Sequence, residues 1–276
     1  MKIAMMSYTL ARGDWGKKPD IAVLCRLANE LGLEGVDWVT TYGHSPSEVR
    51  KITADHGLVS ACYTFGARIQ DPDPEAQARG MDAVREGLDA AAELGVDKVM
   101  VVVSGIPGVP RDTAREVAIK NLKQIVPMGA ALGLAVTVEH FPGADSPFAV
   151  SADVNAAIAE VPGLKVTLDS GNVLMGGENP ADGYLNSWEN IIHAHFKDWE
   201  LAEDGRPGLD GRLYRPALIG EGLVDPEPVV RAMASKGYAG FIDFEYEGNV
   251  YSPEEAMRKG VPPLKDLIAR VMEEAA

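Results

Sequence analysis

The chain has 276 residues, 46% hydrophobic and 24% charged, with 41 acidic against 26 basic residues and a formal net charge of −15. This average globular composition excludes a disordered or fibrous chain, and so acidic a surface, which repels phosphate, argues against nucleic acid as a partner. The sequence has no apolar run long enough to span a bilayer and no signal-peptide pattern, and its two cysteines lack the spacing of metal ligands. It therefore predicts a cytoplasmic protein with no membrane partner.

Short β-branched runs alternate with longer amphipathic segments eight times along the chain, and we expect each run to form a strand. Several runs are apolar at consecutive positions, which is typical of parallel strands buried on both faces. The predicted strands occupy residues 2–8, 35–39, 58–65, 98–104, 135–141, 164–169, 191–198 and 240–247.

Eight strand–helix units in about 250 residues predict the α/β fold class and, within it, a single (β/α)₈ TIM barrel. A doubly wound open sheet is the alternative, but the turn after the first strand, residues 8–13, has no glycine-rich phosphate fingerprint. No Ser/Gly/Pro-rich linker divides the chain, so we expect one barrel domain over residues 1–276.

Residues 199–224 form the longest stretch without a predicted element, and they are rich in Gly, Asp and Arg. Loops of this length in compact domains usually act as lids or binding loops. Because the stretch follows the seventh predicted strand, we expect it on the barrel face where active sites lie.

Charged side chains occur near the carboxyl ends of four consecutive predicted strands, which in a barrel converge on one pocket. The fifth strand carries Glu139, the sixth Asp169, the seventh histidines and the eighth carboxylates. Such residues in buried strands are costly unless they are paired or bound to a metal. Three oxygen ligands and one nitrogen favour Mn²⁺, with Mg²⁺ or Co²⁺ as alternatives, over a structural zinc.

Alternation along the last two strands leaves several candidates on each. The residues that share a face are His193, His195 and Lys197 on the seventh strand, and Asp243, Glu245 and Glu247 on the eighth. We expect the middle residue of each set to bind the metal, which is His195 on the seventh strand and Glu245 on the eighth. The alternative is that these charges form ion pairs inside the barrel, such as Lys197 with Asp243 or Glu247.

The ordered set of motifs resembles a known family, the sugar phosphate isomerase/epimerase group. These are xylose isomerase-like barrels that include ketose 3-epimerases, inosose dehydratases and hydroxypyruvate isomerases. The motifs are Glu139, then Asp169-x-Gly-Asn172, then His195-x-Lys197-Asp198, then Gly220-Glu221-Gly222-x-x-Asp225, then Glu245.

The resemblance implies that one divalent metal is bound by Glu139, Asp169, His195 and Glu245. It further implies that the two glutamates flank the substrate and exchange its proton. The chain departs from the epimerase pattern at Asn172, where those enzymes usually have a histidine that contacts substrate oxygens. Their substrate-binding arginine is also not evident, and the candidates to replace it are Arg206, Arg212 and Arg215.

Five residues are expected to contact the substrate. Asp145 lies where the epimerases carry a substrate-contacting acid, and His140 adjoins Glu139. Trp15 follows the first predicted strand, where an aromatic side chain would cover one face of a sugar ring. The full set is Asn172, Asp145, His140, Lys197 and Trp15.

The sequence therefore predicts a metal-dependent sugar isomerase or epimerase that transfers a proton through a metal-stabilised enediolate on a small keto sugar or polyol. We expect one divalent ion, Mn²⁺ first, with Mg²⁺, Co²⁺ or Zn²⁺ as alternatives. A lyase on the same scaffold, acting on an inosose, a dehydroshikimate or a 3-keto-glycoside, is the second interpretation, since elimination shares the first step.

Two interpretations come from other classes of protein. An apurinic endonuclease would need a zinc site with many histidines, whereas the chain has five histidines and a charge of −15. A non-catalytic carbohydrate-binding or partner subunit would retain the barrel without turnover. The resemblance extends to barrels that form dimers and tetramers, so a homo-oligomer is among the expected states.

Overall fold

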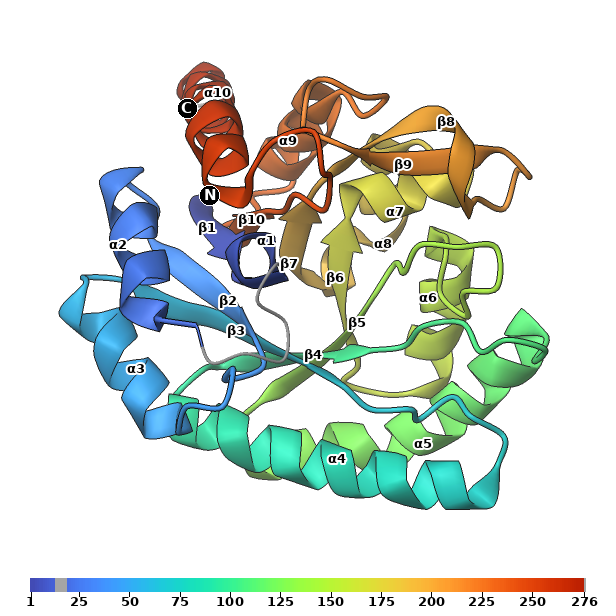
Figure 1. Cartoon of the computed structure of the whole chain (residues 1–276). Coiled ribbons are helices and arrows are strands. Elements are labelled where there is room, and N and C mark those ends of the chain that lie inside the picture. Colours follow the sequence, from blue (N-terminus) through green and yellow to red (C-terminus); the bar gives the residue numbers. More distant parts are fainter. Residues whose placement is uncertain (13–18, 276) are drawn as a thin grey trace.

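The computed structural model describes residues 1–12 and 19–275. Eight parallel strands close into a barrel in the order β1-β10-β7-β6-β5-β4-β3-β2, at the centre of Figure 1. The barrel strands are β1 (Lys2–Met6), β2 (Gly35–Val39), β3 (Val59–Gly66), β4 (Lys98–Val102), β5 (Ala135–Glu139), β6 (Lys165–Asp169), β7 (Ile191–Phe196) and β10 (Phe241–Phe244). The predicted (β/α)₈ barrel is confirmed.

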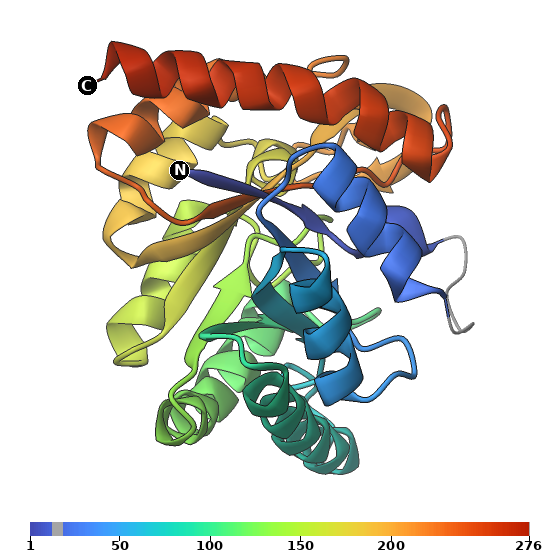
Figure 2. The same ribbon diagram turned by 90° about the vertical axis from the view of Figure 1, so that its left-hand side faces the viewer.

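Helices surround the barrel, as expected when each parallel strand returns through a crossover. Figure 2 shows the last of them running beside β1, so that its C-terminal end lies near the start of the chain. The helices are α1 (Tyr8–Ala11), α2 (Ile21–Glu30), α3 (Pro46–Asp55), α4 (Pro74–Leu94), α5 (Arg111–Ala131), α6 (Ser151–Glu160), α7 (Ser170–Met175), α8 (Pro180–Ser187), α9 (Pro226–Ser235) and α10 (Pro253–Glu274), with a 3₁₀ turn, η2 (Trp188–Asn190). None of the described helices is both long and apolar enough to cross a membrane.

The chain forms its helix ends with local signals in the sequence. The side chain of Asp20 accepts a hydrogen bond from the backbone N–H of Ala22 and so caps the start of α2. Asp73 caps α4 in the same way, and α4 ends at Gly95, whose φ of 83° lies in the left-handed region. These caps fix where α2 and α4 begin and where α4 ends before the next strand.

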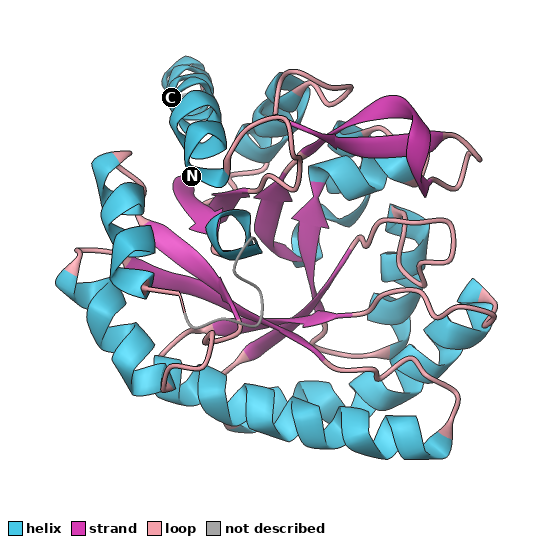
Figure 3. Cartoon of the chain, in the orientation of Figure 1, coloured by secondary structure: helices cyan, strands magenta, loops and turns pink. Residues whose placement is uncertain are grey.

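The expectation that residues 199–224 contain no regular secondary structure is wrong. Two strands, β8 (Asp198–Pro207) and β9 (Leu213–Ala217), form an antiparallel hairpin there, which projects beside the barrel in Figure 3. Trp199 and Tyr214, one from each strand, are buried in a small apolar cluster. Because little else in the hairpin is apolar, the sequence lacks the regular alternation that predicts a strand.

The barrel strands divide their side chains between two environments. In β1, Ile3 and Met5 belong to the main apolar core between strands and helices. Met6 belongs instead to a small separate cluster with Cys62 and Met100. The interior of the barrel also holds buried polar side chains, among them Thr137 and Thr167, whose hydroxyls lie 2.9 Å apart. The functional residues lie in this polar interior.

Candidate metal centre and active-site pocket

The four predicted metal ligands come from four neighbouring strands. Glu139 ends β5, Asp169 ends β6 and His195 lies near the end of β7. Glu245 directly follows β10, and its backbone N–H donates a hydrogen bond to the Phe196 carbonyl at 3.0 Å. Strand register places Asp169 opposite His195. The last barrel strand was predicted to end at residue 247 but ends at Phe244, so Glu245 lies at the rim of the barrel.

The four side chains are buried and converge. His195 Nδ1 lies 3.6 Å from Glu139 Oε2 and 3.6 Å from Glu245 Oε2. Ligand atoms of Glu139, Asp169 and His195 all lie within 4.8 Å of one another. Within these four side chains, three buried atoms find no hydrogen-bond partner among the described residues: Asp169 Oδ2, His195 Nδ1 and Glu245 Oε2. Such atoms are costly in a protein interior unless something satisfies them, and this donor set fits a divalent cation.

Lys197 brings a positive charge to the same carboxylates. Its Nζ lies 3.0 Å from Glu245 Oε1, 3.0 Å from Glu247 Oε1 and 3.2 Å from Asp169 Oδ2. Burial lowers the pKa of Lys197, but the surrounding carboxylates outweigh it and raise that pKa well above its usual value. The alternative prediction paired Lys197 with Asp243 or Glu247. The ion pair with Glu247 is present, whereas Asp243 pairs with His193 instead.

Burial makes two of the carboxyl groups hold protons more tightly. It raises the pKa of Asp169 to about 6, although the charge of Lys197 opposes the shift. It also raises the pKa of Glu245 well above its usual value. The pKa of Glu247 moves the other way, to about 2, because attraction to Lys197 outweighs its burial. Burial thus disfavours the charged forms of Asp169 and Glu245 unless a nearby positive charge compensates them.

A cavity of about 190 Å³ opens over this group. Its lining combines Glu139, Lys197 and Glu245 with Glu247 and an exposed arginine, Arg206. The remaining lining residues are mostly apolar: Met6, Tyr8, Val39, Thr64, Val102, Phe141 and Pro142. Asp169 and His195 are fully buried and do not line it. A small polar ligand in this cavity would meet carboxylates and an ammonium against apolar walls.

The structure separates the predicted substrate-binding residues. Lys197 lines the cavity, and Trp15 lies outside the described residues. Asn172 instead supports the centre, because its backbone N–H donates to Asp169 Oδ1 at 2.9 Å and its amide to the His140 carbonyl at 2.8 Å. Asp145 is exposed, and its carboxylate lies against the backbone of Gly105 rather than in the lining.

His140 does not reach the cavity either. Its side chain is fully buried and absent from the lining, because alternation turns it away from Glu139. Burial lowers the pKa of His140 to about 4, and the charges of Glu178 and Asp153 offset only part of this. A neutral, buried imidazole outside the lining is not placed to bind substrate.

Of the three candidate arginines, the hairpin brings Arg206 to the cavity. Its guanidinium carbon lies 5.9 Å from the centre of the Trp199 ring. Arg212 and Arg215 form ion pairs elsewhere, with Asp210 and Glu200. The sequence left these three equivalent, because the hairpin register that separates them was not predicted.

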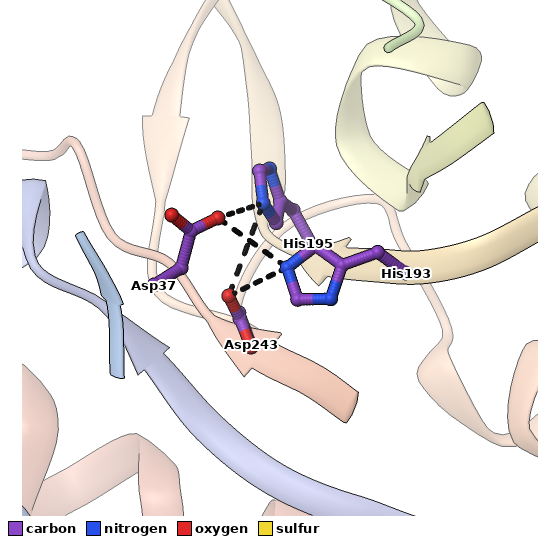
Figure 4. A group of neighbouring side chains, drawn as sticks. All are labelled: Asp37, His193, His195 and Asp243. Atoms are coloured by element: carbon purple, nitrogen blue, oxygen red, sulfur yellow. Dashed lines mark hydrogen bonds and ion pairs between the residues drawn. The ribbon is translucent and has the colours of Figure 1, made fainter. Parts of the chain in front are cut away.

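Sequence reasoning missed Asp37 on β2. This residue is fully buried, and its Oδ2 lies 3.1 Å from His195 Nε2 and 3.3 Å from His193 Nε2 (Figure 4). Asp243 Oδ2 lies 3.0 Å from His193 Nε2. A charged residue within the otherwise apolar run 35–39 was the available signal, the same one that identified the ligands on later strands.

A parallel barrel with acidic and imidazole side chains at the ends of adjacent strands defines the class of this protein. The chain belongs to the xylose isomerase-like TIM barrel family, whose model matches residues 25–267. It is 21% identical over 134 residues to an inosose dehydratase from Lacticaseibacillus casei, a match that covers 46% of this chain and 45% of that protein. The match thus spans about half the length of this curated relative.

Solved structures share the whole fold. A 3-keto-D-glucoside 4-epimerase from E. coli superposes with a TM-score of 0.77 at 18% identity, covering 96% of this chain and 99% of that one. The IOLI protein, solved with a bound zinc atom, superposes with a TM-score of 0.80 at 15% identity, covering 98% and 99% of the two chains. At these identities the likeness establishes the fold alone.

Proposed function

We propose that the protein is a divalent-metal-dependent sugar isomerase or epimerase acting on a small keto sugar or keto-polyol. The observation that carries this proposal is the pair Glu139 and Glu245, which line one cavity and each lie 3.6 Å from the same nitrogen of His195. Two carboxylates on either side of a substrate are the arrangement that moves a proton between two faces of one carbon. The solved epimerase of the same fold supports this class of reaction.

Glu139, Asp169, His195 and Glu245 would hold one divalent cation. Their hard oxygens favour Mn²⁺, with Mg²⁺, Co²⁺ or Zn²⁺ as alternatives, and a related barrel contains zinc. When bound, the cation would supply a Lewis acid for the carbonyl and neighbouring hydroxyl oxygens of the substrate.

The two glutamates would carry the proton. One glutamate, in its ionised form, removes the proton from the carbon beside the carbonyl, and the other, in its protonated form, donates its own proton to the opposite face of that carbon or to the neighbouring carbon. The first outcome is epimerisation and the second isomerisation. The raised pKa of Glu245, caused by its burial, suits the proton donor of this pair, and Lys197 keeps its carboxyl group in place.

A second candidate function is a lyase on the same site, and the curated inosose dehydratase relative favours it. Protonated Glu245 would then give its proton to a departing hydroxyl instead of returning it to carbon. An inosose, a dehydroshikimate or a 3-keto-glycoside would be the substrate.

Time-resolved NMR in D₂O distinguishes the two functions. The Mn²⁺-loaded protein is first screened against ketoses, inososes and 3-keto-glycosides by product analysis, and hits are repeated with Mg²⁺ for NMR. We expect solvent deuterium at the carbon beside the carbonyl, with no loss of water or aglycone. Loss of either would establish the lyase, and the absence of exchange with every substrate would contradict both functions.

A further inference from the structure

His195 stands between two buried groups in the barrel. One is the proposed metal centre, and the other is a core His/Asp group of Asp37, His193, His195 and Asp243, drawn in Figure 4. All four side chains of the core His/Asp group are fully buried, so no bulk water competes for their hydrogen bonds. His195 belongs to both groups and therefore links them.

The two ring nitrogens of His195 face different partners. Nε2 lies 3.1 Å from Asp37 Oδ2 and 3.9 Å from Asp243 Oδ2, so Asp37 is within hydrogen-bond distance and Asp243 is not. Nδ1 faces Glu139 and Glu245, each at 3.6 Å, and makes no hydrogen bond with a described residue. A carboxylate oxygen can only accept, so Nε2 carries a ring proton, and in the neutral ring this leaves the lone pair on Nδ1.

Asp37 is itself held in place. The hydroxyl of Thr64 lies 3.0 Å from its Oδ1 and 3.1 Å from its Oδ2, and donates to this carboxylate. Thr64 belongs to β3, the strand that pairs with β2. The carboxylate therefore has a fixed orientation toward His195.

We propose that Asp37 is a positioning residue for the metal centre. By accepting the Nε2–H of His195, it fixes the ring orientation and tautomer that direct the Nδ1 lone pair at the cation, and it makes that nitrogen a stronger ligand. The inference rests on the proposed metal centre, because it assigns His195 Nδ1 as a ligand.

The same four residues of the core His/Asp group offer an alternative, a second cation of their own. That ion would require His195 to bind metals through both nitrogens as an imidazolate. The contacts of 3.0, 3.1 and 3.3 Å are ordinary hydrogen-bond distances, which a ring proton explains without this. We therefore assign the core His/Asp group to hydrogen bonding and make a second ion an outcome of the test.

Metal affinity of two matched variants tests the proposal. Asp37→Asn keeps the shape of the side chain but removes its charge. Asp243→Asn makes the same change beside His193, at a carboxylate that lies beyond hydrogen-bond distance of His195. We expect Asp37→Asn to weaken Mn²⁺ and Zn²⁺ binding by about 10- to 100-fold in competition with a chelator. Asp243→Asn should weaken it at most a few-fold. Equal affinities of the two variants would overturn the proposal.

An NMR measurement on the unaltered protein needs no variant to fold. In ¹⁵N-labelled, Zn²⁺-loaded protein, His195 should carry its proton on Nε2 and bind the metal through Nδ1. A proton on Nδ1, or two metal ions per chain by elemental analysis, would overturn the proposal. If the unaltered protein binds no divalent ion, the metal centre also fails; if it binds one and Asp37→Asn binds as tightly, only the role of Asp37 fails.

Discussion

At the scale of single residues, the carboxyl groups of the centre differ in what holds them. Lys197 neutralises Glu247 and reaches one oxygen of Glu245, while the second oxygen, Glu245 Oε2, has no hydrogen-bond partner among the described residues. In Asp169, the backbone of Asn172 fixes Oδ1, while Oδ2 makes no hydrogen bond but lies in an ion pair, 3.2 Å from Lys197 Nζ. One oxygen of each group is therefore held by a hydrogen bond, and the other is not.

Replacing the proposed proton carrier tests its role directly. Glu245→Gln keeps the volume of the side chain but can neither take up the substrate proton nor offer a charged oxygen. We expect kcat to fall by about 10²- to 10⁴-fold. Glu247→Gln alters the other glutamate beside Lys197 and is the matched control, and its kcat should fall less. Wild-type turnover in Glu245→Gln, with any substrate that the protein converts, would contradict the assignment.

His140 makes a prediction about stability and pH. Burial lowers its pKa from 6.5 to about 4, so the unfolded chain takes up a proton at a higher pH than the folded one. The neutral, buried His140 thus contributes about 3 kcal/mol to the free energy of unfolding above pH 6.5, and this contribution is lost as the pH falls toward 4. Urea unfolding of the protein and of His140→Gln should show the free energy of unfolding of the unaltered chain falling more steeply with acid. Parallel curves would contradict the burial argument.

At the scale of elements, the barrel strands were predictable and the hairpin was not. Buried parallel strands are apolar runs such as 98–104, which stand out from amphipathic helices. In the hairpin, Trp199 and Tyr214 are buried within a segment rich in Gly, Asp and Arg, and the strand register shifts between Leu201 and Arg206. No local pattern encodes that shift, so the position of Arg206 at the cavity depends on tertiary packing.

The helix after β6 packs closely against the start of the hairpin. A Cβ added at Gly171 would lie 2.7 Å from Trp199 Cδ1 and 2.8 Å from Lys197 Cγ, whereas one at Gly66 would meet nothing within 4 Å. We therefore expect Gly171→Ala to destabilise the fold by about 1–3 kcal/mol, since overpacking forces neighbours to move. Gly66→Ala should change stability little. Thermal unfolding measures both, and equal midpoints would show that the contact is not tight.

The hairpin also predicts that two of its arginines differ in their effect on substrate binding. Arg206 lines the cavity, whereas Arg212 is held by Asp210 away from it. If Arg206 donates hydrogen bonds to substrate, Arg206→Ala should raise KM by about 10-fold or more. Arg212→Ala should leave KM near the wild-type value, and metal affinity should be unchanged in both. Steady-state kinetics decide, and equal KM values would remove Arg206 from the substrate site.

At the scale of the whole molecule, barrel closure brings the centre together. Glu139 and Glu245 are more than a hundred residues apart in the chain, yet β5 and β10 are separated in the barrel by β6 and β7 alone. The ligand set could be predicted because the carboxyl ends of parallel strands meet at one rim. Asp37 carries the same signal, a charge in an apolar run, but its strand lies on the other side of β1 from β10 and so outside the four consecutive strands that share the motif. A few of the 41 acidic residues are thus interior groups, and most others face solvent.

The most direct test of the central claim is anomalous diffraction from crystals of the Mn²⁺-loaded protein. The account predicts one peak at coordination distance from Glu139, Asp169, His195 and Glu245, facing the cavity that holds Lys197. A peak between Asp37, His193 and Asp243 would place the ion in the core His/Asp group and contradict the assignment. A structure without any peak at Glu139 and Glu245, at saturating Mn²⁺, would contradict metal-dependent catalysis at this site.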